Sequence, residues 1–299
     1  MRPQLKGVAV AMLGGDAREV ILAERLESLG ARVKAVGVPF PLEKSCRGIE
    51  ICRDISEGLE GVQAVILPVP GINDRGELYA VLPGRPLILS VELLSCLPAG
   101  TPVLVGVARR ILKEMIDRCN LRLIELMSLD EVAILNSIPS AEGAVQLAME
   151  NSGITIHGSS SLVLGFGRTA ITLARLLGAM GSRTTVVARN PAHRARAVEM
   201  GLGAVDFSQL GNAAANADFV YNTVPAMILD KGALDRVSPE ALIIDLASPP
   251  GGTDFQEAQR LGIKAILAPG LPGKVAPKTA GKILSGVVPR ILVEELTLH

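Results

Sequence analysis

A glycine-rich turn between an apolar run and an amphipathic run constrains this chain more than any other feature of its sequence. The run Leu162–Leu164 has the branched side chains of a buried strand, and residues 165–170 then read Gly-Phe-Gly-Arg-Thr-Ala, a G-x-G-x-x-A pattern. Gly165 permits the tight turn, and Gly167 lets a ligand approach bare backbone. The small methyl group of Ala170 lets the next helix pack closely on the strand.

The run after this turn, Thr169–Met180, has the periodicity of an amphipathic helix. The first turn of such a helix presents free backbone N–H groups and the positive end of the helix dipole, and both attract phosphate. The order strand, glycine turn, helix distinguishes a dinucleotide fingerprint from an ordinary glycine turn. We therefore predict a Rossmann domain that binds the pyrophosphate of a nicotinamide dinucleotide with Gly165, Gly167, Arg168 and Thr169.

The residue after the second predicted strand, Thr184–Ala188, indicates which nicotinamide cofactor is preferred. NAD-binding folds place Asp or Glu there to bind the ribose 2′-hydroxyl, whereas this chain has Arg189. A guanidinium pairs with a 2′-phosphate through forked hydrogen bonds, so we predict NADP, with NAD as the alternative. The expected cofactor residues here are Arg189, Asn190 and Arg194. The competing interpretation is that Arg189 is a solvated residue before a helix that Asn190 caps.

Small residues and prolines follow the next three predicted strands, Phe219–Asn222, Leu242–Leu246 and Ala265–Leu267. Ligands of open parallel sheets bind at this carboxyl edge. We therefore predict a backbone-lined nicotinamide pocket, although each segment alone could be an ordinary turn. The expected contributors are Thr223, Val224, Pro225 and Ser248.

Strand-like and helix-like runs alternate along the whole chain, which predicts an α/β protein with two doubly wound parallel-sheet domains. Strands are expected in the first half at Val8–Leu13, Arg32–Val36, Ala64–Leu67, Leu87–Leu89, Val103–Val105 and Leu121–Ile124.

Two helical segments suggest how the domains are connected. Pro139 should divide the segment 128–150 into two helices, with Ser140 capping the second. A last amphipathic helix, Thr279–Leu296, is expected to return to the first domain. We assign residues 1–130 and 276–299 to an N-terminal substrate domain, and residues 131–275 to the Rossmann NADP-binding domain.

The composition argues against several other functions. The chain has a formal net charge of zero and only 2% aromatic residues, which makes a nucleic-acid surface a poor expectation. No apolar run reaches the roughly 18 residues that span a membrane, so a cytoplasmic location is expected. The four cysteines form no CxxC pair, which predicts buried reduced thiols and no metal site.

Several longer segments resemble the A subunits of dipicolinate synthase. The matching stretches span most of the chain: residues 14–18 (GGDAR), 136–144 (NSIPSAEGA), 163–169 (VLGFGRT), 244–248 (IDLAS), 250–252 (PGG) and 268–281 (APGLPGKVAPKTAG). The last stretch is much more specific than the glycine turn. Ala170 departs from the pattern, where Gly is expected, but its methyl is small enough for pyrophosphate binding to survive.

This resemblance implies oxidation of dihydrodipicolinate to dipicolinate with NADP or NAD. It also implies a flavoprotein-like B subunit of the synthase as partner and the mother cell of a sporulating bacterium as location. A homo-oligomer is expected. A substrate with two carboxylates needs cationic or hydroxyl groups that hold it in a fixed orientation. The candidates are Arg18, Ser140, Lys274 and Lys278, and for each the alternative is an ordinary surface residue.

The catalytic base stays unassigned: Glu142 and Asp245 are weak candidates and Asp16 is another possible acid or base, but each could instead be a helix-start residue or a hydrogen-bond acceptor. Two other interpretations of the chain remain open. One is a different two-domain NADP-dependent dehydrogenase, similar to shikimate or hydroxyacid dehydrogenases. The other is a non-catalytic nucleotide-binding subunit.

Overall fold

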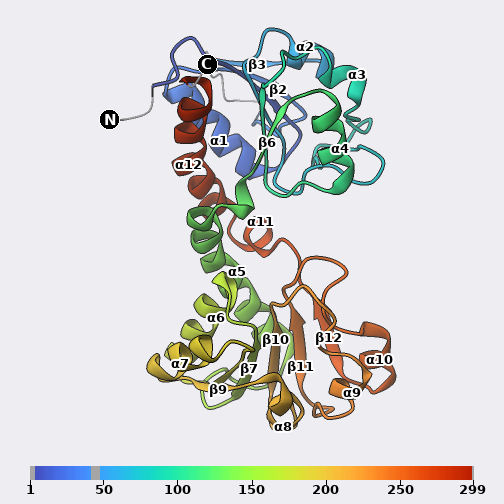
Figure 1. Ribbon diagram of the computed structural model, residues 1–299, viewed down its shortest axis with the longest axis vertical. Helices are drawn as coiled ribbons and strands as arrows, with labels where there is room; N and C mark the ends of the chain where they lie inside the picture. Colours follow the sequence, from blue (N-terminus) through green and yellow to red (C-terminus); the bar gives the residue numbers. More distant parts are fainter. Residues whose placement is uncertain (1–3, 42–47, 298–299) are drawn as a thin grey trace. The chain divides into compact units, whose positions relative to one another are not determined.

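The computed structural model describes residues 4–41 and 48–297, which form two compact units (Figure 1). The first unit comprises Met1–Ala133 together with Ala276–His299, and the second comprises Ile134–Val275. Among the described residues, no helix is both long enough and apolar enough to span a membrane.

Each unit is built on a six-stranded parallel sheet with the same topology. The first sheet has the order β3-β2-β1-β4-β5-β6, and its strands are β1 (Ala9–Leu13), β2 (Arg32–Val36), β3 (Ile49–Ile51), β4 (Ala64–Ile66), β5 (Pro102–Val105) and β6 (Arg122–Glu125). The second has the order β12-β11-β10-β7-β8-β9, and its strands are β7 (Ser160–Leu164), β8 (Arg183–Val187), β9 (Gly203–Val205), β10 (Phe219–Asn222), β11 (Leu242–Asp245) and β12 (Lys264–Leu267). The strand order therefore reverses between β1 and β4 and between β7 and β10, where ligands of such sheets bind.

Helices cover both faces of each sheet, and each face has its own apolar core. The first unit contains α1 (Ala17–Ser28), α2 (Ile55–Leu59), α3 (Val91–Leu94), α4 (Arg110–Arg118), the 3₁₀ turn η1 (Leu126–Ser128) and α12 (Pro277–Thr297). The second contains α6 (Arg168–Ala179), α7 (Pro191–Glu199), η2 (Phe207–Gln209), α8 (Leu210–Ala214), α9 (Lys231–Leu234), α10 (Phe255–Arg260) and α11 (Leu271–Val275). Helix α5 (Asp130–Asn151) begins in the first unit and continues into the second.

The predicted fold class is confirmed, but three strand assignments differ. The edge strands β3 and β9 were not predicted, because their residues are exposed or half-buried and form no apolar run. The predicted strand Leu87–Leu89 is wrong. Only Ile88 pairs there, in an isolated antiparallel bridge with Glu77, and Leu89 is buried within a loop.

The predicted break at Pro139 is also wrong, because α5 continues through it. A proline in a helix removes one N–H donor, in this case the one that would reach the carbonyl of Leu135. Serine hydroxyls on either side donate instead to neighbouring carbonyls, from Ser137 to Ile134 (2.6 Å) and from Ser140 to Asn136 (2.9 Å). Ser140 is therefore an interior helix residue and not the cap of a second helix.

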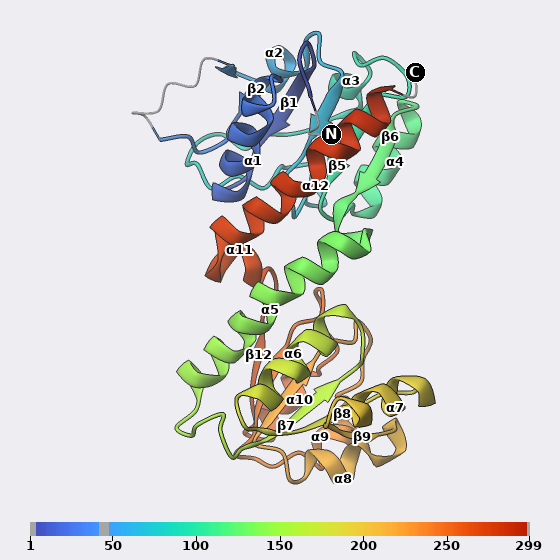
Figure 2. The ribbon, with the colours of Figure 1, turned by 90° about the vertical axis from the view of Figure 1, so that its left-hand side faces the viewer.

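Helix α12 packs against α1, as the predicted return to the first domain requires (Figure 2). Gly281 makes this approach possible, since a side-chain carbon there would lie 3.0 Å from Ile21 and 3.1 Å from the carbonyl oxygen of Arg18. One turn later, the Ser285 hydroxyl donates to the carbonyl of Ile21 (3.4 Å). The two helices therefore run in the same direction, and their N-termini lie side by side.

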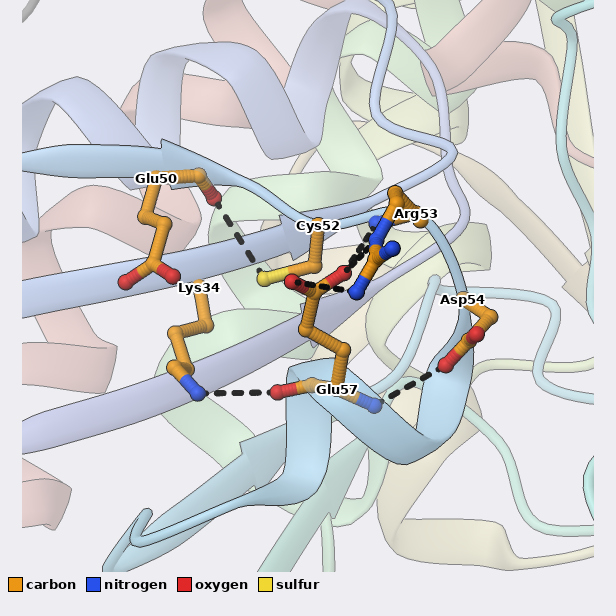
Figure 3. A network of polar contacts seen from close by, with 6 residues as sticks. All are labelled: Lys34, Glu50, Cys52, Arg53, Asp54 and Glu57. Atoms are coloured by element: carbon orange, nitrogen blue, oxygen red, sulfur yellow. Dashed lines mark hydrogen bonds and ion pairs between the residues drawn. The ribbon is translucent and has the colours of Figure 1, made fainter.

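A buried lysine connects strand β2 of the first sheet to α2 (Figure 3). Lys34 on β2 donates to the carbonyls of Glu57 (2.8 Å) and Glu60 (3.1 Å), at the end of the helix where its dipole is negative. Cys52 lies beside this network, and burial, followed by the charge of Glu50, raises the pKa of its thiol.

The prediction of buried, reduced cysteines holds only in part. Three cysteines are described and all are free thiols, but Cys96 is exposed and Cys119 half-buried, so only Cys52 is buried. Cys46 lies outside the described residues.

Candidate active site

The glycine turn after β7 has a backbone that only glycine adopts easily. Gly165 has a φ of +98°, and a side-chain carbon there would lie 2.7 Å from the Thr223 hydroxyl oxygen. Thr223 itself is fixed, because its hydroxyl and its backbone N–H both donate to the carbonyl of Leu164 (2.7 and 3.1 Å). The turn and the end of β10 are therefore held together as one surface.

Gly167 opens helix α6 without a side-chain cap. Apart from Gly167 itself, its two chain neighbours and the adjacent helix backbone, no atom of the described residues lies within 4 Å of the position that a side-chain carbon on Gly167 would take. The N–H groups of residues 168–170 belong to the first turn of α6 and therefore have no acceptor within the helix. Ala170 is fully buried against the sheet, so the helix packs as the pattern predicts. A helix N-terminus of this kind is the arrangement that binds phosphate groups in dinucleotide-binding folds.

The segment between β8 and α7 leaves the Arg189 guanidinium exposed and without a hydrogen bond or ion pair to any described residue. Its neighbours have structural tasks. The side chain of Asn190 accepts from the N–H of Ala192 and caps α7, while Arg194 donates to the carbonyls of Ala188 (2.8 Å) and Arg189 (2.7 Å). Asn190 and Arg194 therefore shape the turn that presents Arg189.

Aromatic contact joins this segment to the glycine turn. Phe166, between the two turn glycines, is buried and packs on His193 of α7, with ring centroids 5.7 Å apart. This contact holds the turn after β7 against helix α7, which follows β8.

Asp245, at the end of β11, anchors the loops that follow the neighbouring strands. It is fully buried and lies opposite Asn222 in the register of β10 and β11. One carboxylate oxygen accepts from the Asn222 amide (3.0 Å) and the N–H of Ala247 (3.0 Å). The other accepts from the N–H of Gly252 (2.8 Å) and the hydroxyl of Thr253 (2.7 Å). Four donors already surround this carboxylate, which argues against a role as general base.

Asn222 completes this network on the other side. Its amide oxygen accepts from the N–H of Val224 (3.0 Å), and its amide nitrogen donates to the carbonyl of Val224 (3.1 Å). Gly252 must be glycine, since a side-chain carbon there would lie 2.3–2.7 Å from atoms of Ala226, Asn222 and Val224. The Asn-Thr-Val-Pro segment is therefore a rigid loop beside the glycine turn, and Ser248 lies exposed on the next loop.

A buried ionic cluster lies at the switch point of the first unit. Asp16 follows the Gly14–Gly15 turn after β1 and accepts a forked pair of hydrogen bonds from Arg18, from Nε (2.9 Å) and Nη2 (2.8 Å). Arg18 is only 6% exposed, and its third nitrogen, Nη1, makes no hydrogen bond with the described residues. In the described part of the chain, the Tyr221 hydroxyl is the one side-chain polar atom that is both fully buried and without a partner. Nη1 of Arg18 also has no partner, so it must be accessible to solvent.

Glu19 holds this cluster to a second loop. Its carboxylate accepts from the N–H of Asp16 (2.8 Å), which completes a capping box on α1, and from the N–H of Val69 after β4 (3.3 Å). Burial raises the pKa of Glu19. Burial also acts to raise the pKa of Asp16, but the hydrogen bonds and charge of Arg18 outweigh it and lower that pKa.

The other predicted site residues lie on the surface or inside helices. Glu142 is exposed on α5 and lines a groove between α5 and α6, so it is not at a strand end, where chemistry would be expected. Lys274 is exposed on α11 in the second unit, and Lys278 is exposed in the first turn of α12 in the first unit. The Ser140 hydroxyl is engaged by the Asn136 carbonyl, as described above.

Three residues of these networks were not among the predicted site residues: Glu19, Asn222 and Thr253. For Asn222 a signal was present, because Asn222 and Asp245 both end adjacent predicted strands. Half-exposed Tyr79 was also missed; burial and the charge of Asp16 raise the pKa of its phenol. Nothing in the local sequence indicates that Tyr79 lies near Asp16, because the two are brought together only by the loop after β4.

Two family models match the chain. Residues 9–127 match the N-terminal domain of the dipicolinate synthase A subunit, and residues 137–249 match the NAD-binding domain of D-isomer-specific 2-hydroxyacid dehydrogenases. The second match spans the glycine turn and the Asn222–Asp245 network. The second unit is therefore a nicotinamide dinucleotide-binding domain of the dehydrogenase type.

Relatives match over nearly the whole length. The chain is 39% identical to the dipicolinate synthase A subunit of Bacillus subtilis over 290 residues, which are 97% of each chain. A crystal structure of this synthase's A subunit from Bacillus subtilis has a TM-score of 0.93 at 38% identity, with all of both chains covered. That of the A subunit from Bacillus halodurans has a TM-score of 0.91 at 36% identity, covering 97% of this chain and 99% of the other.

Replacing Asp245 by Asn tests whether its carboxylate is structural. We expect Asp245→Asn to lower the free energy of unfolding by about 3 kcal/mol, because an amide would turn its N–H₂ group toward two of the four donors. Urea unfolding followed by circular dichroism measures this. Asp230→Asn is the matched control, since this exposed residue caps α9 and Asn caps equally well. Unchanged stability in Asp245→Asn would contradict the structural role.

Proposed function

The chain belongs to the family of dipicolinate synthase A subunits, and from that premise we propose that this NAD(P)-dependent oxidoreductase oxidises dihydrodipicolinate to dipicolinate with NADP as hydride acceptor. The observation that carries the proposal is the unobstructed, uncapped N-terminus of α6 behind the G-x-G-x-x-A turn. It supplies backbone N–H groups for a pyrophosphate, in a chain whose similarity to these subunits covers nearly its whole length.

The reaction removes a hydride and a proton from the substrate ring. Dihydrodipicolinate and NADP⁺ give dipicolinate, NADPH and H⁺, and the aromaticity of the product favours this direction. The bound nicotinamide supplies the hydride acceptor. The protein has to hold the cofactor in one orientation and fix a substrate with two negative charges against it.

Cofactor binding is assigned to the second unit. The N–H groups of Arg168 and Thr169 would bind the pyrophosphate beside Gly165 and Gly167. The rigid loop of Thr223, Val224 and Pro225, together with Ser248 on the next loop, would line the nicotinamide side. Asp245 supports this arrangement indirectly, because its four hydrogen bonds hold both loops.

The preference for NADP rests on Arg189. Its exposed guanidinium has no partner among the described residues and follows β8, where the adenosine ribose of such folds is read. Asn190 and Arg194 would act by shaping the turn, since their side chains hold α7 and the backbone of residues 188 and 189. NAD is the alternative cofactor.

Substrate carboxylate binding is assigned to the first unit, with Arg18 as the principal anchor. Asp16 fixes two nitrogens of the guanidinium, so Nη1 is pre-oriented without losing side-chain entropy on binding. The adjacent N-termini of α1 and α12 add two positive dipole ends and the exposed cation of Lys278. Lys274 is a second candidate cation.

The same resemblance supports a partner and a location. We propose that the chain associates with the flavoprotein-like B subunit in the cytoplasm of the mother cell. A chain that binds nucleotide but turns over substrate only with this partner would be the non-catalytic alternative.

A coupled assay tests the proposed reaction. Dihydrodipicolinate is generated in the assay mixture, and NADP⁺ and the purified chain are added. Dipicolinate and NADPH are then both quantified. We expect the two products in equal amounts, with and without the B subunit. Product only in the presence of that partner would support the non-catalytic alternative. No product in either mixture would contradict the assignment of the substrate.

Removing the Arg189 guanidinium tests the cofactor preference. We expect Arg189→Ser to weaken NADP⁺ binding by about 10- to 100-fold, the loss of hydrogen bonds to a charged phosphate, with NAD⁺ binding little changed. Titration calorimetry measures both affinities. Arg196→Ser removes the same charge from the exposed face of α7, where Arg196 pairs with Glu199, and should change neither. Equal weakening by both variants would mean that net charge, and not a direct contact, sets the preference.

Replacing the Arg18 guanidinium by an ammonium tests whether Arg18 binds the substrate carboxylate. We expect Arg18→Lys to raise the KM for dihydrodipicolinate at least about tenfold, because an ammonium cannot pair with Asp16 and a substrate carboxylate in forked geometry. The KM for the cofactor should not change. Arg25→Lys, on the exposed side of the same helix, is the control. A loss of thermal stability with an unchanged substrate KM would make Arg18 only a structural partner of Asp16.

A further inference from the structure

An apolar groove runs between α5 and α6 on the surface of the second unit. Its volume is about 470 Å³, and its floor is formed by Val145 and Met149 of α5 with Leu176 and Met180 of α6. The two helices lie side by side here, as the hydrogen bond between the hydroxyls of Ser137 and Thr172 requires (2.6 Å; Figure 2). None of these residues belongs to the glycine turn or to the strand-end loops.

The groove continues along α5 as an apolar stripe. Ile134, Ile138, Val145 and Met149 recur at intervals of four or seven residues and fall on one side of the helix. Val145 is buried in the floor of the groove, but Ile138 is 43% exposed and Met149 58% exposed, which is high for side chains of this size. An apolar surface of this extent with a polar rim marks a protein interface, and methionine adapts well to a partner surface.

The two helices that form the groove carry charges of opposite sign. Between Ile134 and Asn151, α5 carries only acidic residues, Glu142 and Glu150, whereas α6 carries only basic residues, Arg168 and Arg175. Glu142 lines the α5 side of the groove, whereas Arg175 is exposed on α6 beside Leu176 and lies outside the groove lining. The face is therefore an acidic ridge and a basic ridge on either side of an apolar groove.

Such a face is complementary to itself. A twofold axis parallel to the two helices would lay groove on groove, and it would place the acidic ridge of one copy on the basic ridge of the other. A partner of uniform charge would match one ridge and repel the other. We propose that this face of α5 and α6 is the interface of a homodimer, with Glu142 of each copy paired to Arg175 of the other copy.

The mass of the full chain in solution tests the proposal independently of the reaction. Sedimentation velocity over a concentration series should give a particle of twice the 31.3 kDa chain mass. Met149→Glu should raise the dimer dissociation constant about 100-fold, because it buries a charge in the apolar groove that the interface covers. Val198→Glu is the control, since Val198 is an equally exposed apolar residue on α7. Circular dichroism verifies that each variant is folded.

A charge exchange separates the proposed pairing from a general effect of charge. Glu142→Arg and Arg175→Glu should each weaken the dimer, and the double variant should restore it to within a few fold of the original. A monomer at all concentrations overturns the proposal, even if the groove then binds the flavoprotein-like partner. A dimer that resists Met149→Glu, or that dissociates equally in Val198→Glu, overturns it as well.

Discussion

The carboxylate of Asp245 is the interaction on which the nucleotide-binding half of the molecule depends. Parallel strands bring their carboxyl ends to one edge of the sheet, and the loops that leave this edge have unpaired backbone N–H groups. A single buried carboxylate satisfies donors from several loop segments at once, through Asn222, Ala247, Gly252 and Thr253. Because a buried charge is tolerated only when its lone pairs are filled, this requirement also specifies one arrangement of the loops.

In the first unit, the loops at the carboxyl edge of the sheet are held by several ionic side chains. Its switch point also follows a glycine turn, but there Asp16, Arg18 and Glu19 form a short ionic cluster instead of a single acceptor. Glu19 binds the loop after β1 to the loop after β4, and Asp16 restrains the guanidinium of Arg18. The two units thus share one topology, while the end of one is shaped for backbone contact with a phosphate and the end of the other presents a restrained cation. The proposed binding of the cofactor to one unit and of the substrate carboxylates to the other depends on this difference.

Three glycines are required because another part of the chain lies too close for a side chain. Gly165 and Gly252 are needed because Thr223 and the Asn222 loop leave no room for a side chain, and Gly281 is needed where α12 crosses α1. In each case the residue is small because a specific neighbour lies within contact distance. For Gly165 the glycine turn itself gives the physical reason, whereas Gly252 and Gly281 occur in the sequence only within stretches that resemble the family, and the structure supplies the reason for them.

Local chemistry determined much of this protein without reference to its structure. The apolar runs identified most of the buried strands, because strands buried on both faces leave few polar positions. The G-x-G-x-x-A turn identified the cofactor domain, because its requirements lie within six consecutive residues.

Tertiary structure alone decided the rest. The edge strands β3 and β9 carry no apolar run. Helix α5 continues through Pro139, where the hydroxyls of Ser137 and Ser140 donate to the carbonyls of Ile134 and Asn136. Asp245 changed from a candidate base to a structural acceptor because its four donors come from residues up to 23 positions away. The forked ion pair of Asp16 with Arg18 and the third guanidinium nitrogen left without a partner are also visible only in the tertiary structure, because they depend on how side chains are buried together.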